Sequence, residues 1–186
     1  MTFSEFYQSK SSDFNFSSDK GTTHDYIDGY YSDIFTPLRE KEINLLEIGM
    51  YKGQSIRLFR EWFINGKIFG MDIGEYVDPN MLQIEGASLL WGDAFNSSML
   101  DLFKNDFFDF IIDDGPHTLE SQLYSVVYWS QKLKSGGKLI IEDVQNINHT
   151  VYLERMVDTN LFTFKTFDLR ANKNRYDDII FEVTKK

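Results

Sequence analysis

Acidic side chains and a histidine follow two apolar runs in the second half of the chain. Residues 113–117 read Asp-Asp-Gly-Pro-His after the first run, and Glu142 and Asp143 follow the second. In an open α/β sheet, ligands bind beyond the carboxyl ends of the strands, so these side chains lie where chemistry is expected. Oxygen ligands without sulfur favour Mg²⁺, Ca²⁺ or Mn²⁺ over zinc. The pattern therefore indicates a site for a hard divalent cation.

His117 stands three residues after Asp114, near the start of a predicted helix. An ordinary imidazole titrates near pH ~6.5 and can take a proton from a hydroxyl at neutral pH. The alternative interpretation is structural, with Asp114 and Asp143 capping helices and His117 making a structural hydrogen bond. Three crowded carboxylates without a cation would repel one another, which favours the functional interpretation.

A glycine turn follows the first apolar run, and Gly49 and Gly53 in it are separated by three residues. Glycine lets the backbone approach a ligand, and the amides at the start of the next helix can hold a carboxylate or a phosphate. The dinucleotide fingerprint G-x-G-x-x-G is not met, which disfavours a nicotinamide cofactor. The alternative is a loop for S-adenosylmethionine, in which an acid and glycines frame the methionine part.

Further acids close the early apolar runs at Glu47, Asp72 and Asp93. Asp72 lies 19 residues after Gly53, which suits an acid that accepts hydrogen bonds from ribose hydroxyls. Gly92 and Asp93 then suit the adenine side of a nucleoside. The predicted cofactor-binding residues are Glu47, Gly49, Gly53, Ser55, Asp72, Gly92, Asp93, Asp113 and His24.

The elements that must position these residues alternate along the chain. Strands are predicted at 43–48, 67–73, 87–91, 107–112 and 138–141, and helices at 24–38, 55–64 and 119–133. Such alternation predicts an α/β fold with a doubly wound, mostly parallel sheet of Rossmann-like type. The apolar runs 161–169 and 178–183 lack a helical pattern between them, so they are expected to form a C-terminal antiparallel hairpin.

Length and composition favour one domain, expected over residues 20–186, because 186 residues with 42% hydrophobic content can bury a sizeable core. Residues 1–19 are expected to be a poorly ordered or partner-packing arm, and their phenylalanines leave room for a homodimer. A formal charge of −10 opposes binding to nucleic acid or to an anionic membrane. Without an apolar run of membrane-spanning length or a secretory signal, the expected location is cytoplasmic.

Several segments together resemble the macrocin and mycinamicin class of sugar O-methyltransferases. They are Asp19-Lys20-Gly21, His24, Tyr26, Leu46-Glu47-Ile48-Gly49, Gly70-Met71-Asp72-Ile73, Gly92-Asp93, Ile112-Asp113-Asp114-Gly115-Pro116-His117 and Ile141-Glu142-Asp143. The resemblance implies a Rossmann-like enzyme that uses S-adenosylmethionine and a divalent cation, usually Mg²⁺, to methylate a hydroxyl of a sugar or glycan. By motif position it implies Asp114, Glu142 and Asp143 as metal ligands. It implies His117 as the general base, so that His117 and Asp114 form the predicted catalytic pair.

Two other functions fit the same residues. One is a metal-dependent O-methyltransferase that acts on a catechol or another small vicinal diol, for which the cation site would look the same. The other is a non-catalytic module that binds a nucleoside or a glycan within a larger assembly. For such a module, changing His117 or Glu142 would leave biological activity intact.

Overall fold

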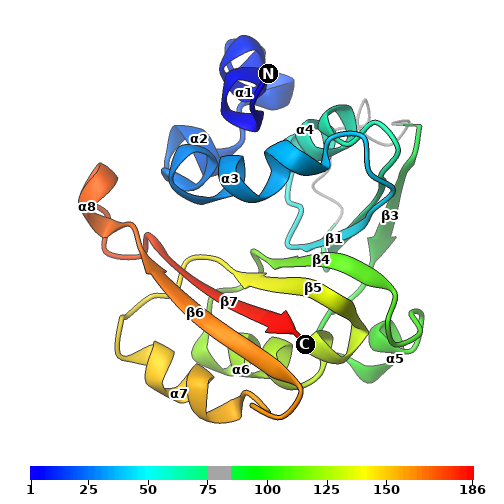
Figure 1. The fold of residues 1–186 in the computed structure, drawn as a ribbon, viewed down its shortest axis with the longest axis vertical. Helices are drawn as coiled ribbons and strands as arrows, with labels where there is room; N and C mark the ends of the chain where they lie inside the picture. The colour runs from blue at the N-terminus through cyan, green and yellow to red at the C-terminus, as the bar shows by residue number, and fades with distance from the viewer. Residues whose placement is uncertain (75–84) are drawn as a thin grey trace.

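The computed structural model describes residues 1–74 and 85–186, and its centre is a sheet with strand order β3-β2-β1-β4-β5-β7-β6 (Figure 1). The strands are β1 (Asn44–Ile48), β2 (Lys67–Asp72), β3 (Ala87–Trp91), β4 (Phe108–Asp113), β5 (Leu133–Ile141), β6 (Phe162–Asp168) and β7 (Ile179–Lys185). Strands β1 to β5 pair in parallel, whereas β7 lies antiparallel between β5 and β6. The predicted fold class, including its antiparallel C-terminal pair, is confirmed.

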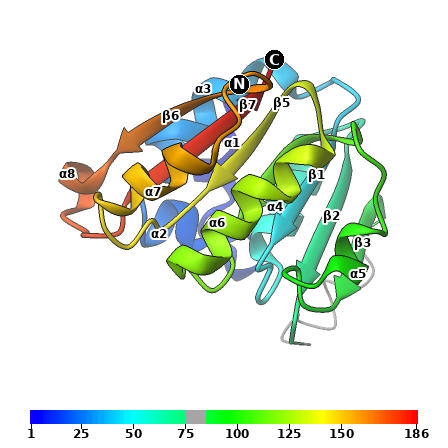
Figure 2. The same ribbon diagram turned by 90° about the horizontal axis from the view of Figure 1, so that it is seen from below.

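Helices cover both faces of the sheet (Figures 1 and 2). The described helices are α1 (Phe3–Lys10), α2 (Asp19–Thr22), α3 (Ser32–Phe35), α4 (Gln54–Trp62), α5 (Ser97–Leu100), α6 (Leu119–Val127), α7 (His149–Met156) and α8 (Arg170–Lys173). α1 to α4 lie on one face, and α5, α6 and α7 lie on the other. Within the described ranges, no helix is both long enough and apolar enough to cross a membrane.

Two hydrophobic cores explain why the central strands read as unbroken apolar runs. Leu45 packs into the core under α1, α3 and α4, whereas its neighbour Leu46 packs into the core on the α6 side. Ile112 and Ile111 alternate between the same two cores. A parallel sheet that is covered on both faces needs apolar residues at successive positions.

Residues 1–19 differ from the prediction of a poorly ordered or partner-packing arm. α1 starts with a capping box between Thr2 and Glu5, and Phe3, Phe6 and Tyr7 are buried in the chain's own core. The ring of Phe3 lies 5.3 Å from that of Trp62 in α4. The spacing of positions 3, 6 and 7 places these side chains on one helix face, so the segment belongs to the domain.

Three other local predictions are corrected. α7, which starts at His149, falls where the sequence analysis assigned no element, and α8 lies between the strands of the C-terminal pair. β5 begins at Leu133, so it is longer than the strand predicted at 138–141. The helix predicted at 119–133 ends earlier, at Val127, and a short 3₁₀ turn over Trp129–Lys132 follows. Short elements such as these carry a weak periodic signal.

The glycine turn after β1 joins three strand ends. Gly49 has a φ of 85° and donates its amide hydrogen to the carbonyl of Met71 at the end of β2, at 2.8 Å. The amide of Asp114, just after β4, donates to the carbonyl of Ile48 at 2.9 Å. A Cβ atom on Gly49 would lie 1.9 Å from the carbonyl oxygen of Asp114. The turn therefore requires glycine both for its conformation and for the close approach of the Asp114 loop.

Replacing Gly49 by alanine should destabilise the protein far more than the same change at Gly136. Gly136 has a similar φ of 79°, but its Cβ would meet no atom within 4 Å. Gly136→Ala should therefore cost only the left-handed conformation, about 1–2 kcal/mol. Gly49→Ala adds a backbone overlap and should cost at least about 2 kcal/mol more. Urea unfolding of both variants measures the difference, and equal losses would show that the close approach at Gly49 is not needed.

Candidate active site

A cavity of about 610 Å³ opens at the carboxyl ends of the parallel strands. From β1, the chain adds β2 and β3 on one side of the sheet and β4 and β5 on the other, so the direction in which strands are added changes between β1 and β4. In open α/β sheets, ligands bind at such a point. The predicted site residues that line the cavity are Gly49, Asp72, Gly92, Asp93, Asp114 and His117. The structure thus brings together the acids that end β2 and follow β3 and β4.

Asp72 and Asp93 are held by backbone amides beside the cavity. The two carboxylate oxygens of Asp72 accept hydrogen bonds from the amides of Tyr51, at 2.9 Å, and Gly74, at 3.0 Å. Asp93 accepts from the amide of Phe95 at 2.9 Å. A carboxylate offers about four acceptor sites, so Asp72 retains capacity for a ligand's hydroxyl groups. Its position also links the glycine turn to the end of β2.

Five predicted cofactor residues lie outside the lining of the large cavity, and three of these, Glu47, Gly53 and Ser55, lie between β1 and the start of α4. Ser55 borders a smaller cavity of about 170 Å³, which shares Gly49 and Asp114 with the larger one. Gly53, with a φ of 86°, forms the N-cap of α4. The carboxylate of Glu47 is fully buried and accepts a hydrogen bond from the Ser55 hydroxyl. Glu47 therefore acts inside the fold and does not reach the large cavity.

Lys20 lies at the centre of the site, although no role was predicted for it from the sequence. Its ammonium, with the side chain only 1% exposed, lies 2.6 Å from Asp114 Oδ2 and 3.2 Å from Glu47 Oε1, and it also contacts Glu142 Oε2. Burial lowers the pKa of Lys20, but the three carboxylates together raise it well above its ordinary value. Burial raises the pKa of Glu47 to about 7, although Lys20 opposes that change. Lys20 is thus a fixed positive charge at the ends of β1, β4 and β5.

The predicted ligand set divides into two parts in the structure. Asp114 and Asp143 come together with His117, whose Nε2 lies 3.9 Å from Asp114 Oδ1 and 3.7 Å from Asp143 Oδ2. Glu142 instead has one oxygen against Lys20 and the other against the hydroxyl of Tyr31. The Asp114, His117 and Asp143 ligand atoms lie within 4.8 Å of one another. Because Mg²⁺ bonds of roughly 2.1 Å space its ligands about 3 to 4 Å apart, these residues fit a hard divalent cation.

Backbone strain coincides with this cluster. His117 has a φ of 55° and Asp143 a φ of 51°, both in the left-handed region that non-glycine residues seldom adopt. Strained residues persist only where their surroundings hold them, and they concentrate at functional sites. The two side chains that face each other across the cluster are therefore presented by unusual local conformations.

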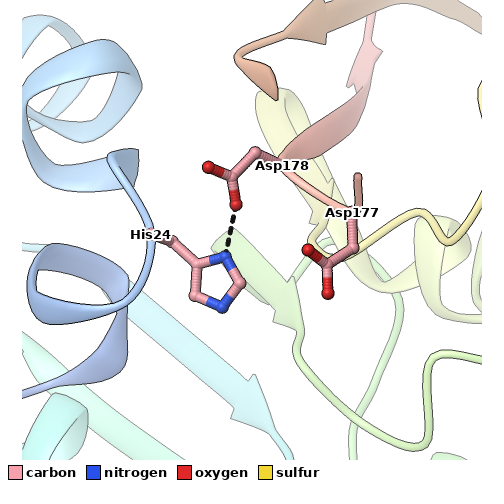
Figure 3. A group of neighbouring side chains, drawn as sticks. All are labelled: His24, Asp177 and Asp178. Atoms are coloured by element: carbon pink, nitrogen blue, oxygen red, sulfur yellow. Dashed lines mark hydrogen bonds and ion pairs between the residues drawn. The ribbon is translucent and has the colours of Figure 1, made fainter. Parts of the chain in front are cut away.

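His24 lies in a second buried cluster, at the start of β7 (Figure 3). Its Nδ1 atom is 2.6 Å from Asp178 Oδ1, and Asp177 lies beside them. Arg175 pairs with Asp177 at 2.9 Å. The two cavities at the ends of β1 and β4 are lined by other residues. The placement of His24 therefore gives no support to the predicted contact with a cofactor, and the histidine joins the N-terminal segment to the C-terminal strands.

Asp113, the last residue of β4, directly precedes the loop over residues 114–117. Its side chain is buried, and Oδ1 accepts a hydrogen bond from the amide of Gly115 at 3.2 Å. Burial raises the pKa of Asp113 to about 6, against the lowering effect of its hydrogen bonds. It lies outside the cavity lining, so its position indicates support of the turn between Asp114 and His117.

No family model matches this chain, but named proteins resemble it over most of its length. It is 30% identical over 124 residues to the mycinamicin VI 2''-O-methyltransferase of Micromonospora griseorubida, an alignment that covers 62% of this chain and 30% of that protein. It is 28% identical over 133 residues to the demethylmacrocin O-methyltransferase of Streptomyces fradiae, covering 67% of this chain and 33% of that protein. The chain thus spans about a third of the length of these relatives.

Solved structures share the fold. MycE methyltransferase of the mycinamycin pathway, in complex with Mg, SAH and mycinamycin VI, superposes with a TM-score of 0.71 at 21% identity, over all of this chain and 54% of that one. The fibrillarin of Methanococcus jannaschii, a pre-rRNA processing protein, has a TM-score of 0.63 at 14% identity over 80% of this chain and 68% of that one. The predicted resemblance to macrocin-type and mycinamicin-type enzymes and the predicted methyltransferase fold are confirmed.

The buried carboxyl of Asp113 should make stability fall as the pH rises. With a pKa of about 6 in the folded chain and an ordinary value of 3.8, the folded state retains a proton that the unfolded state has lost between these values. The free energy of unfolding should therefore decrease from pH 4 to pH 7, with at most about 3 kcal/mol from this residue. Asp113→Asn should remove that part of the slope.

Urea unfolding in EDTA, at several pH values, compares the two proteins. All other acids contribute equally to both, so the difference between the two curves isolates residue 113. Parallel curves for the two proteins would contradict the raised pKa.

Proposed function

We propose that this protein is an S-adenosylmethionine-dependent O-methyltransferase that methylates a sugar hydroxyl with the help of a divalent cation. One observation carries the proposal. Asp114 and His117, which form a cluster with Asp143, line the same cavity as Gly49, Asp72 and Asp93. A nucleoside cofactor and a cation-bound hydroxyl would therefore meet in one space. The resemblance to named O-methyltransferases supports the assignment, as does the MycE structure with Mg and SAH.

The cofactor would lie along the ends of β1, β2 and β3. The turn at Gly49 allows close approach of the backbone, and Asp72 would accept hydrogen bonds from the ribose hydroxyls. Asp93, after β3, would face the adenine side. Residues 114–117, the loop after β4, line the same cavity, and a cofactor held there would supply the methyl group. Because the sulfonium is already a good leaving group, the protein supplies chiefly position and charge stabilisation.

Asp114 and Asp143 would hold the cation, as Mg²⁺ or Mn²⁺, through the carboxylate oxygens that face His117. When bound, such a cation lowers the pKa of the attacking hydroxyl. His117 would accept the hydroxyl proton at Nε2, and the flanking carboxylates would stabilise the imidazolium that forms. Burial raises the pKa of the neighbouring acids Glu47 and Glu142, and the ammonium of Lys20 opposes that rise in both.

Transfer of a labelled methyl group from S-adenosylmethionine to a panel of acceptors tests the function. We expect transfer to glycosides that carry free sugar hydroxyls, dependent on added Mg²⁺ and lost in excess EDTA. Transfer to catechols alone would identify the acceptor as a small vicinal diol and not a sugar. Activity that survives exhaustive chelation would contradict the role of the cation. Absence of both methyl transfer and calorimetric binding of S-adenosylhomocysteine would favour the non-catalytic module.

Two substitutions should separate proton transfer from cofactor binding. His117→Ala should lower kcat by a factor of about 10² to 10⁴, the usual contribution of a general base, with the affinity for S-adenosylhomocysteine and Mn²⁺ changed less than about twofold. Asp72→Asn should instead weaken S-adenosylhomocysteine binding by about tenfold, because the ribose loses a charged acceptor. Calorimetry and steady-state kinetics measure both. A large loss of Mn²⁺ affinity in His117→Ala would make His117 a metal ligand instead of the base.

A further inference from the structure

A further cavity, of about 570 Å³, lies at the connection between β6 and β7. It is lined by charged and polar side chains, one aromatic ring and one alanine, namely Asp168, Arg170, Ala171, Asn174, Arg175 and Tyr176. These residues come from the end of β6, from α8 and from the turn that leads to β7. The proposed methyl transfer gives no role to this β6–β7 cavity.

The β6–β7 cavity lies on the same edge of the sheet as the acidic cluster of Asp114, His117 and Asp143. Because β7 runs antiparallel to β5, the start of β7 lies beside the end of β5. The amide of Val144 donates to the carbonyl of Ile179 at 3.1 Å. The turn that leads to Ile179 therefore adjoins the acidic cluster.

Tyr176 connects the β6–β7 cavity to the acidic cluster. Its hydroxyl donates to Oε1 of Gln145 at 3.1 Å, and Nε2 of Gln145 donates to the carbonyl of Asp143 at 3.1 Å. Tyr176 is nevertheless 65% exposed. An exposed aromatic ring thus lies one side chain away from the cluster, where a bound ligand can contact it.

The order of the strands determines the side toward which an acceptor extends. The proposed cofactor residues follow β1, β2 and β3, the acidic cluster follows β4 and β5, and the β6–β7 cavity lies beyond β5 (Figures 1 and 2). In methyl transfer by direct displacement, the attacking oxygen approaches the methyl carbon from the side opposite to the sulfur. An acceptor bound at the cluster therefore lies on the side away from the cofactor, and its remainder extends toward the β6–β7 cavity.

The polar groups of the β6–β7 cavity suit a neutral ligand with many hydroxyl groups. Arg170 binds Asp168 through Nε at 2.8 Å and Nη2 at 2.7 Å, and Arg175 binds Asp177 at 2.9 Å. A guanidinium has five N–H donors, so both arginines retain donors for a ligand, and Asn174 adds an amide. Because each guanidinium already has a carboxylate partner, little positive charge is left to attract a phosphate.

The wall formed by α8 is fixed before any ligand binds. The ammonium of Lys173 donates to the carbonyls of Gly21, at 2.6 Å, and His24, at 2.7 Å. The side-chain amide of Asn172 donates to Asp25 at 2.6 Å. α8 is therefore held against the N-terminal segment. A preformed wall reduces the ordering that a ligand has to impose when it binds.

We propose that the β6–β7 cavity binds a second sugar of the acceptor against the ring of Tyr176, so that the substrate is an oligosaccharide or a glycan. The inference rests on the proposed function for the position of the methylated sugar at the acidic cluster. A sugar packs its C–H face on an aromatic ring, while polar side chains bind its hydroxyl groups. An apolar aglycone would need a mainly apolar lining, whereas four of the six lining side chains are polar or charged.

Methyl transfer to matched acceptors tests the second sugar. The acceptors are methyl glycosides of glucose, galactose, mannose and rhamnose, the corresponding butyl glycosides, and disaccharides that carry the same four sugars. We expect kcat/KM to be at least about tenfold higher for a disaccharide than for the methyl glycoside of the same sugar. A higher kcat/KM for the butyl glycosides than for the disaccharides would overturn the inference.

Tyr176→Ala should reduce this preference for the disaccharide by about three- to tenfold, because the second sugar loses the ring. The matched control is Tyr152→Ala, which removes a 50% exposed tyrosine from α7 and should leave the preference within about twofold. Tyr176→Phe keeps the ring and should also stay within about twofold, although it loses the contact with Gln145. Equal preferences in Tyr176→Ala and Tyr152→Ala would overturn the inference.

Asn174→Gly is a second variant of the cavity. Glycine tolerates the φ of 56° at this position, so the change removes the amide and keeps the turn. We expect the preference for the disaccharide to fall by about two- to tenfold, as for the loss of a hydrogen bond. If Tyr176→Ala loses its near-ultraviolet circular dichroism, Asn174→Gly decides the inference, and an unchanged preference in it would be a negative result.

Saturation-transfer NMR with the same disaccharides, in EDTA and without cofactor, measures binding apart from the reaction. Binding that Tyr176→Ala weakens and Tyr152→Ala does not, in the absence of any methyl transfer, would uphold the sugar site while the proposed function fails. Methyl transfer with equal kcat/KM for methyl glycosides and disaccharides would uphold the function and overturn the inference. Absence of both binding and transfer would overturn both.

Discussion

The buried ammonium of Lys20 is the interaction on which the site and the N-terminal half of the fold depend. A lone buried charge costs several kcal/mol, and removing one partner of a buried pair leaves the others uncompensated. Lys20 meets acids from the ends of three different strands, β1, β4 and β5, and comes from α2, which precedes the sheet in the chain. Its charge therefore joins the N-terminal segment to the carboxyl edge of the sheet. The ammonium of Lys20 compensates the charge of these crowded acids, and the acids in turn compensate the burial of Lys20.

This constraint makes the N-terminal segment part of both the core and the site. The rings of α1 pack on α4, while Lys20, Tyr26 and Tyr31 reach the acids at the other end of the same layer. The N-terminal segment is therefore fixed at two places, by apolar packing of α1 on α4 and by polar contacts with the acids. The strained turns at His117 and Asp143 then lie between a rigid sheet and a rigid N-terminal layer, which is the setting in which strained conformations persist.

Much of the fold and the outline of the site could be predicted because they depend on local patterns. The alternation of apolar strands and helices predicts a parallel sheet, and acids after the strands predict its functional edge, where Asp72, Asp93 and Asp114 line one cavity. The partners of these acids could not be predicted in this way. Lys20 and Glu142 are 122 residues apart, and Tyr26 and Asp143 are 117 apart. Such pairings depend on the three-dimensional packing of α2 and the following turn, which no sequence period encodes.

The division of the acids follows from charge balance. Crowded carboxylates are a reason to expect a metal ion only where no side chain supplies the positive charge. Lys20 supplies it for Glu47 and Glu142, and its contact with Asp114 uses one oxygen of that residue. The carboxylate of Asp143 accepts a hydroxyl hydrogen from Tyr26, with the imidazole of His24 at 3.5 Å and that of His117 at 3.7 Å. The uncompensated negative charge therefore gathers at Asp143 and the second oxygen of Asp114, beside the cavity, where a divalent cation has most to gain.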